Sequence, residues 1–446
     1  MLQGRQTDRL IAKVMRLGVV YEPLMKTSEA FQTVFISEGG ITSPAKKGLT
    51  WGKDFSYADF YFEAQGLKKG EYYYLSAETG GVEHLVSVNG KKVGLIDKVE
   101  GERDGVFRIH GLLLLDNLKN GDKVNVEAYY SHSLPGTMPY DEVSTFALKS
   151  YAPVRPYKRV TLFTIWQNLA KFSQKLTLLN KHYLSREDNT FEKVAVEKVY
   201  ARLFEILPME PSRLSDEALY KAVEVIDEYF KNCAKYKPFV GVIGHSHLDT
   251  AWLWTVEETR HKLMRTLSNA VTLLEKYPDY KFFLSTVLYL KWVEEDDPDL
   301  FVKVKELIKK GRIEPNGSTW VECDGNLTGA EAFCRQFIRG KRYLRDKFDY
   351  ESDTFWLPDT FGYSAALPQI MKKSGVKYFC TTKLGWNDTN TFPYETFVWQ
   401  GNDGSAVITH FNSIQTAIDD KSVSERLSNV RDKRESDCVL MAYGYG

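Results

Sequence analysis

The eight residues HSHLDTAW, at positions 245 to 252, carry side chains that can bind a metal ion. His245, His247 and Asp249 stand at two-residue steps directly after the apolar run 239–243. In an extended chain this step points all three side chains the same way. Imidazole nitrogen and carboxylate oxygen are suitable zinc ligands, and a catalytic zinc takes about three ligands from the protein. The spacing therefore predicts a metal site, although a lone histidine would more often be a buried structural residue.

A second candidate is the carboxylate of Asp359 in the stretch FWLPDTFGYS. It follows an apolar run, so we expect it to point inward, where a charge is costly unless a cation or metal ion pairs with it. The alternative is a helix N-cap, but the next helix is expected near Ser364, several residues later. The sequence therefore favours Asp359 as an active-site residue.

Other polar residues in this half of the chain are weaker candidates. Trp320, Glu322 and Asp324 alternate in TWVECDGN, where they line either a polar pocket or a solvated loop. His261, inside an expected helix, and His410, near the end of an expected strand, are assigned structural or surface roles.

The elements that must position these residues alternate between strand and helix from residue 239 onward. Amphipathic helices such as TVEETRHKLMRTLSNAVTLLEKY and AEAFCRQFIRGKRYLRDKF join several of the strands. This alternation indicates a parallel sheet, either a barrel or a doubly wound sheet, with working residues at the carboxyl ends of the strands. The seven expected strands are 239–244, 281–286, 313–318, 354–358, 377–382, 406–411 and 438–443.

The preceding part of the chain divides into two further regions. Residues 1–155 carry short alternating runs broken by turn signals such as NG and KNGD, which predict an antiparallel β-sandwich. Its tyrosines make either a sugar-binding face or a purely structural sheet. Residues 156–236, from TLFTIWQNLAKF onward, repeat apolar residues at helical steps and predict a helical segment, with Ser215 as an N-cap. The third domain is then 237–446.

Composition excludes several classes of partner. Lysine plus arginine total 59, as do aspartate plus glutamate, so no net charge favours nucleic acid or an anionic membrane. The five cysteines form no C-x-x-C pair and are expected to be reduced. No leader or membrane-spanning run is evident, so we expect a cytoplasmic protein. A homo-oligomer remains open.

From residue 239 to 446 the chain resembles the catalytic domain of glycoside hydrolase family 38 α-mannosidases of the bacterial type. The front half is similar to that of longer members, more weakly. The resemblance rests on four motifs in the family's order: HSHLDTAW, GRIEPNGSTWVECDGN, FWLPDTFGYSAALPQI and TKLGWNDTNTFPYETFVWQGNDGS.

The resemblance implies a distorted seven-stranded β/α barrel that holds one zinc ion and cleaves α-mannosides with retention. By the motifs, His247 and Asp249 are zinc ligands and Trp252 lies beside the sugar. Asp359 is both nucleophile and zinc ligand, and Lys383 is the basic residue that follows it. The substrate implied is an α-mannoside oligosaccharide or glycan.

Two pieces of the family pattern are missing from this sequence. The acid/base aspartate and a fourth zinc ligand, a histidine, are expected beyond Gly446. By this interpretation the chain is the front portion of a longer enzyme, a truncated barrel with little activity of its own.

Other functions compete with this interpretation. A metal-dependent amidohydrolase shares the His-x-His strand end, but needs further histidines, and after residue 247 only His261 and His410 remain. A silent carbohydrate-binding protein and a zinc-dependent polysaccharide deacetylase are the remaining alternatives.

Overall fold

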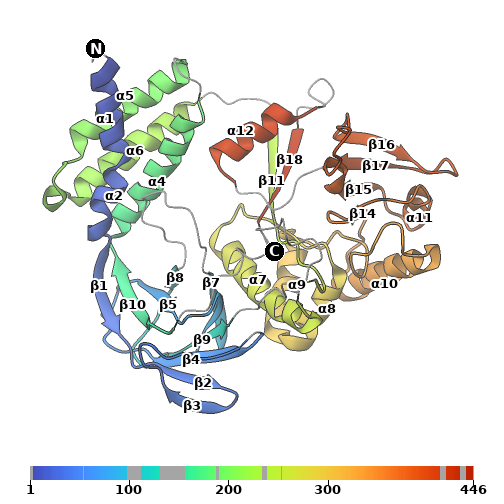
Figure 1. The fold of residues 1–446 in the computed structure, drawn as a ribbon, viewed down its shortest axis with the longest axis horizontal. Helices are drawn as coiled ribbons and strands as arrows, with labels where there is room; N and C mark the ends of the chain where they lie inside the picture. The colour runs from blue at the N-terminus through green and yellow to red at the C-terminus, as the bar shows by residue number, and fades with distance from the viewer. Residues whose placement is uncertain are drawn as a thin grey trace. The chain divides into compact units, whose positions relative to one another are not determined.

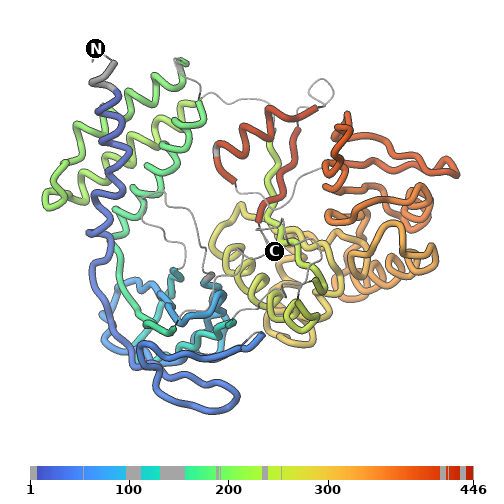
Figure 2. The backbone as a smooth tube through the Cα atoms, viewed as in Figure 1, coloured from blue at the N-terminus to red at the C-terminus, as the bar shows by residue number. Residues whose placement is uncertain are grey.

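The computed structural model describes residues 4–53, 55–97, 112–130, 156–186, 190–233, 239–252, 254–411, 418–431 and 438–444. The chain forms two compact units, residues 1–235 with 419–421 and residues 236–418 with 422–446. Figure 1 labels their helices and strands, and Figure 2 follows the same backbone as a tube. Helices and both parallel and antiparallel sheets are present, so the multidomain α/β character is confirmed.

The first unit contains two antiparallel sheets. The four-stranded sheet has the order β1-β10-β5-β8 and the six-stranded sheet has the order β3-β2-β4-β9-β6-β7. Buried side chains from both sheets, such as Phe60 and Leu162, belong to one apolar cluster. The strands are β1 Lys26–Phe31, β2 Phe35–Glu38, β3 Ile41–Pro44, β4 Tyr57–Glu63, β5 Tyr73–Glu78, β6 Glu83–Val88, β7 Lys91–Asp97, β8 Leu112–Leu115, β9 Lys123–Tyr129 and β10 Arg159–Ile165. The shared cluster supports the predicted sandwich, which remains a prediction.

The helices of the first unit are packed around a second apolar cluster. They are α1 Gly4–Met15, α2 Leu17–Tyr21, α4 Gln167–Leu184, α5 Phe191–Ile206 and α6 Asp216–Asn232, with short 3₁₀ turns at Glu22–Leu24 and Pro211–Arg213. The predicted cap is confirmed, because the Ser215 side chain accepts a hydrogen bond from the Ala218 amide at 3.2 Å. Helices α1 and α2 were not predicted, since the sequence reasoning treated the chain start as part of the sandwich.

The assignment of the segment TLFTI to a helix was wrong. Residues Arg159–Ile165 form β10, and the helix begins only at Gln167. Strand β10 pairs with β1 on one side and β5 on the other, and Val160 to Ile165 are all buried. A short apolar run buried on both faces has no period that separates strand from helix, so only its pairing partners decide the outcome.

Strands form at all seven predicted places in the second unit, four of them mutually parallel in one sheet and three mutually parallel in another. The first sheet has the order β13-β12-β11-β18, and the second has the order β14-β15-β17-β16. The parallel strands are β11 Phe239–His245, β12 Phe282–Phe283, β13 Ile313–Glu314, β14 Thr354–Trp356, β15 Tyr378–Thr381, β17 Ala406–Phe411 and β18 Cys438–Tyr443. Strand β16, Thr396–Gln400, was not predicted and forms an antiparallel hairpin with β17.

Helices follow most of these strands. They are α7 Val256–Lys276, α8 Val287–Asp296, α9 Pro298–Lys309, α10 Ala330–Phe348, α11 Leu367–Lys373 and α12 Asp420–Asn429, with a 3₁₀ turn at Lys383–Gly385. Helices α7, α8 and α9 share an apolar cluster with residues of β12 and β13. No helix among the described residues is both long enough and apolar enough to span a membrane.

Side chains connect the two sheets of this unit where the strands themselves do not pair. The Oδ1 atom of Asn316, just after β13, accepts hydrogen bonds from the amides of Asp353 and Thr354 at 3.0 and 3.1 Å. At the other seam, Arg426 of α12 donates to Glu395 at 2.8 Å and to the carbonyl of Leu440 at 3.5 Å. The strand order along the chain is that of a β/α barrel, while the barrel itself remains a prediction.

Candidate metal and catalytic centre

Three chain segments that leave parallel strands converge in the second unit. His247 and Asp249 follow β11, Asp359 follows β14, and Lys383 follows β15. Carboxyl ends of parallel strands lie at one edge of a sheet, which is where α/β enzymes place their working residues. The structure therefore brings together residues that the sequence placed on separate strands.

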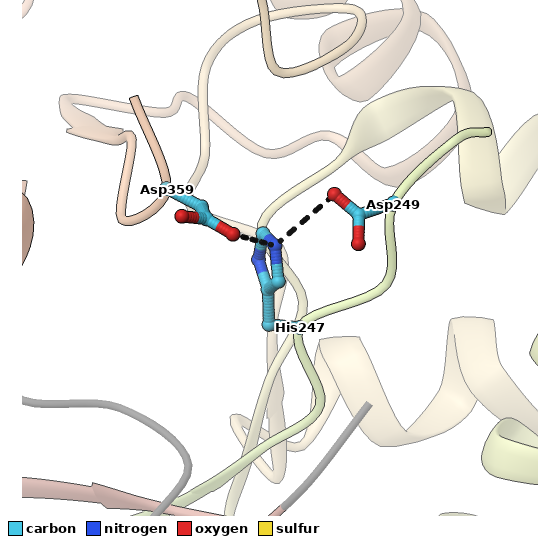
Figure 3. Close-up of side chains that lie close together, drawn as sticks. All are labelled: His247, Asp249 and Asp359. Carbon is cyan, nitrogen blue, oxygen red and sulfur yellow. Dashed lines mark ion pairs between the residues drawn. The ribbon is translucent and has the colours of Figure 1, made fainter. Parts of the chain in front are cut away.

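His247 lies at the middle of the cluster. Its Nε2 atom is 3.6 Å from Asp249 Oδ1 and 3.3 Å from Asp359 Oδ2. Figure 3 shows the imidazole pointing between the two carboxylates, with Asp359 entering from a different segment of the chain. One ligand atom from each of the three residues lies within 4.8 Å of the others. His247 itself is buried, with 4% of its surface exposed.

Helix α7 holds the segment that carries Asp249. The hydroxyl of Thr259, a fully buried residue of α7, donates toward the carbonyls of Asp249 and Thr250 at 2.9 Å. The hydroxyl of Tyr289 donates to the carbonyl of Leu248. Because helices α7 and α8 together fix the loop backbone at several points, the Asp249 carboxylate is held in place before any ligand binds.

Asp359 and Lys383 are tied together by their own strands. The Thr382 hydroxyl donates to the carbonyl of Pro358 at 2.5 Å, which links the ends of β14 and β15. Next to this link, Lys383 Nζ lies 2.7 Å from Asp359 Oδ1. The ammonium group is largely buried and also lies 3.6 Å from the ring centroid of Trp386. Lys383 therefore orients the Asp359 carboxylate.

The electrostatic environment of His247 is dominated by carboxylates. Burial alone lowers its pKa, but Glu322, Asp249 and Asp359 outweigh burial and raise the pKa to about 12. The N···O separations exceed normal hydrogen-bond lengths, and neither ring nitrogen has a hydrogen-bond partner among the described residues. A site with this concentration of negative charge around unsatisfied nitrogen atoms favours a bound cation.

The carboxyl group of Asp359 is held ionised. The His247 imidazole 3.3 Å away lowers its pKa most, Lys383 lowers it further, and partial burial raises it; the result is a pKa of about 2. An ionised carboxylate at neutral pH can act as a metal ligand or as a nucleophile.

His245 does not join the cluster, although the two-residue step suggested that it would. Its Nδ1–H donates to the carbonyl of Phe283 at 3.2 Å, and its ring lies 5.2 Å from that of Trp356. Burial lowers the pKa of His245 to about 4, so the imidazole is neutral. The strand ends at His245, so the alternation expected of an extended chain does not continue to His247.

Residues of the stretch 320–324 take both of the roles expected from the sequence, part of a polar site and part of a loop. Glu322 Oε1 lies 3.5 Å from His247 Nδ1 and 3.3 Å from Ser285 Oγ, so it belongs to the site. The carboxylate of Asp324 instead accepts hydrogen bonds from the backbone amides of Asn326 and Leu327 in its own loop. Trp320 packs beside Tyr343 and under Arg339. The strand-end rule that selected Asp359 selects Glu322 equally well, since Glu322 follows β13.

The loop of Glu322 and the loop of Asp359 are in close contact. The Ser364 amide donates to the carbonyl of Gly325 at 3.3 Å. A Cβ atom on Gly325 would lie 2.3 Å from the carbonyl oxygen of Gly362, so a side chain there would push the two loops apart. Glycine at position 325 is therefore required for this approach.

The remaining predicted residues lie outside the cluster. Trp252 is 59% exposed and packs edge-on against Trp254 with ring centroids 5.3 Å apart. His410 Nδ1 lies 3.0 Å from Thr396 Oγ1 across the β16–β17 hairpin, and His261 lies half-buried on α7. Neither histidine is a member of the metal-ligand cluster of the described residues.

The sequence of the unit that carries this cluster is similar to a known protein family. Residues 237–446 match the family model for the "Glycosyl hydrolases family 38 N-terminal domain". This region of the chain is thus similar in sequence to glycoside hydrolase family 38. The family 38 region begins where the second compact unit begins, and it contains every residue of the cluster.

Curated relatives of the family 38 region are named α-mannosidases. Alpha-mannosidase 2C1 of Mus musculus is 43% identical over 212 residues, covering 46% of this chain and 20% of that protein. Alpha-mannosidase G of Dictyostelium discoideum is 40% identical over 210 residues, covering 46% and 19%. A Saccharomyces cerevisiae α-mannosidase is 41% identical over 208 residues, covering 46% and 19%. The chain thus spans about a fifth of the length of these relatives.

Proposed function

We propose that the protein is a zinc-dependent retaining α-mannosidase that acts on terminal α-mannosides. The observation that carries the proposal is the convergence of His247, Asp249 and Asp359 in a unit that matches family 38. These three residues would hold the metal, and Asp359 would also be the nucleophile.

The spacing of the three residues is compatible with a tetrahedrally coordinated ion such as zinc. Ligand bonds of about 2.0–2.2 Å in a tetrahedral arrangement place neighbouring ligand atoms roughly 3.3–3.6 Å apart. The two N···O separations at His247 are 3.3 and 3.6 Å. One imidazole and two carboxylates also match the donor types of a catalytic zinc that keeps an open position. Other divalent ions accept the same donors, so metal analysis must identify the ion.

The chain's own residues account for the nucleophilic half of the reaction. Lys383 holds Asp359 Oδ1, and the ionised carboxylate is then oriented for attack on the anomeric carbon. The new bond from carboxylate oxygen to carbon forms as the glycosidic carbon–oxygen bond breaks, and the leaving oxygen takes a proton from a second carboxylic acid. Water later cleaves the glycosyl ester and frees Asp359. Zinc, when bound, supplies a Lewis acid that orients and polarises the sugar.

Trp252 supports a sugar substrate. Its indole ring is largely exposed and is steadied by Trp254, so it presents an apolar face close in sequence to the metal ligands. The apolar face of a pyranose ring stacks well on such a surface. We therefore propose Trp252 as a substrate-binding residue.

The composition of the cluster disfavours the amidohydrolase alternative. That class needs several histidines at successive strand ends, whereas the cluster found among the described residues contains one histidine and two carboxylates. The five cysteines form no C-x-x-C pair in the sequence, and we propose a reducing compartment such as the cytoplasm.

The decisive experiment measures hydrolysis of an aryl α-mannoside by the complete gene product, with and without a chelator. We expect release of the aryl group, loss of activity on chelation, and recovery when zinc is returned. A folded, zinc-loaded protein that leaves the mannoside intact would refute the proposal, and hydrolysis of cyclic amides in its place would favour an amidohydrolase.

A further inference from the structure

A groove of about 640 Å³ lies on the six-stranded sheet of the first unit, which does not contain the His247 cluster. Residues of β2, β3, β4 and β9 line it, beside the β2–β3 hairpin that forms one edge of the sheet (Figures 1 and 2). Its lining residues include Phe35, Ser37, Asp59, Tyr61, Lys123 and Asn125.

Strand alternation sets these side chains on the outer face of the sheet. In β4 the residues Ala58, Phe60 and Phe62 are buried in the apolar cluster shared with the other sheet. Asp59 and Tyr61 alternate with them and therefore point to the opposite face.

The strand register aligns the lining residues into a row. Phe35 of β2 stands opposite Tyr61 of β4, and Tyr61 stands opposite Asn125 of β9. Ser37 stands opposite Asp59 in the next row of the same face. With neighbouring strands about 4.8 Å apart, the row from Phe35 to Asn125 is about 10 Å long, which a short oligosaccharide can cover.

Aromatic rings form one end of the row. The rings of Phe35 and Tyr61 are nearly parallel, with centroids 5.9 Å apart and an interplanar angle of 23°. Both side chains are half-buried, so they are held in place by the sheet and still present ring surface to the groove. Fixed ring surface of this kind binds the apolar face of a sugar at low cost in conformational entropy.

Polar groups form the other end of the row. Asn125 Nδ2 donates to Asp59 Oδ1 at 2.8 Å, which fixes both side chains. The charged lining residues have both signs, Asp59 and Glu63 against Lys123, which disfavours a strongly anionic ligand.

We propose that this groove is a second carbohydrate site, which binds a neutral oligosaccharide by stacking on Phe35 and Tyr61 and by hydrogen bonds to Asp59 and Asn125. The site goes beyond the proposed hydrolysis, because it lies in the other unit and needs neither the metal nor Asp359. It would hold a polysaccharide or glycan chain on the protein, whichever bond is cut.

The test is native affinity electrophoresis of the full chain in gels that contain yeast mannan. We expect mannan to retard the unmodified chain, and Tyr61→Ala and Phe35→Ala each to weaken that retardation about tenfold, as expected for loss of an aromatic anchor. The matched control is Tyr72→Ala, which removes a tyrosine that is 57% exposed in the same unit and does not line the groove. It should be retarded like the unmodified chain.

Three results would overturn the proposal. One is the absence of retardation of the unmodified chain; another is equal retardation of all variants, which would place mannan binding elsewhere. The third is a lower molecular mass of Tyr61→Ala by light scattering with unchanged retardation, which would assign the groove to a second copy of the chain. Asn125→Ala provides a second test if Tyr61→Ala fails to fold. Failure of mannoside hydrolysis would leave these measurements unaffected, so the two proposals are tested separately.

Discussion

The Nε2 atom of His247 lies 3.3 Å from the Oδ2 atom of Asp359, although the two residues follow strands of different sheets. This contact joins the segment after β11 to the segment after β14. Its length exceeds a normal N–H···O hydrogen bond and matches the separation of two ligands on one metal ion. The proposed metal site and nucleophile both depend on it.

Substitution Asp359→Asn should abolish mannoside hydrolysis. The amide keeps the size of the side chain but is a poor nucleophile, so we expect kcat/KM to fall by about a thousandfold or more. Steady-state kinetics of the complete gene product on an aryl α-mannoside measures this. The control is Asp346→Asn on the exposed face of α10, which should leave activity unchanged. Comparable activity of the two variants would rule Asp359 out as nucleophile.

Substitution His247→Ala should remove metal binding. Because His247 is the nitrogen donor of the cluster, we expect zinc affinity of the 446-residue chain to fall by at least about tenfold. Equilibrium dialysis followed by elemental analysis gives the affinity and the stoichiometry. The control is His261→Ala, which removes a half-buried histidine of the same unit and should retain one zinc per chain. Equal zinc content in both variants would contradict the assignment.

Substitution Lys383→Met should impair catalysis while leaving the metal in place. The long apolar side chain keeps the packing against Trp386 but removes the ammonium group 2.7 Å from Asp359 Oδ1. We expect kcat to fall by about 10–100-fold because the carboxylate loses its orienting partner. Lys377→Met, on an exposed lysine that lies 3.4 Å from Asp353, is the matched control. An unchanged kcat would show that Lys383 is only structural.

Substitution Glu322→Gln should weaken metal binding through His247. The change removes a negative charge 3.5 Å from His247 Nδ1 without changing the shape of the side chain. Loss of such an outer partner costs about 10–100-fold in metal affinity. Competition with a coloured zinc chelator measures the effect, with Asp324→Asn on the same loop as the control. Identical affinities of the two variants would remove Glu322 from the site.

Substitution Asn316→Ala should destabilise the second unit. The side-chain oxygen of buried Asn316 accepts hydrogen bonds from the backbone amides of Asp353 and Thr354. Its loss leaves both amides without that acceptor. We expect the free energy of unfolding of this unit to fall by about 2–4 kcal/mol. Urea unfolding followed by circular dichroism measures it. Asn390→Ala, at an exposed asparagine, should change it little.

Much of the second unit follows from local sequence pattern. The apolar spacing of α7 and α10 has a period that helix geometry imposes directly, and β11 and β18 are short apolar runs within the strand–helix alternation. Ser215 is a similar case, since an N-cap depends on residues three positions apart. The hairpin strand β16 was predictable as well, because TFVWQ is rich in β-branched and aromatic residues and the turn GNDG follows it.

The first unit shows where local pattern fails. Strand β10 lies between β1 and β5, and its central position explains why both of its faces are apolar. Helix α1 packs with α5 and helix α2 with α4, which lie far along the chain. Burial of the apolar side chains of α1 and α2 therefore depends on partners outside any short stretch of sequence.

By itself the sequence determined which residues can do chemistry: His247, Asp249, Asp359, Trp252 and the candidate Lys383, each assigned from its motif. Only the tertiary structure decided which of them meet. It placed Lys383 and Glu322 against the cluster, directed His245 to the carbonyl of Phe283, and left Trp252 exposed. The physical reason is that residue type and period are properties of a short segment. Contact between segments depends on how separate strands pair and on which buried polar groups find a partner.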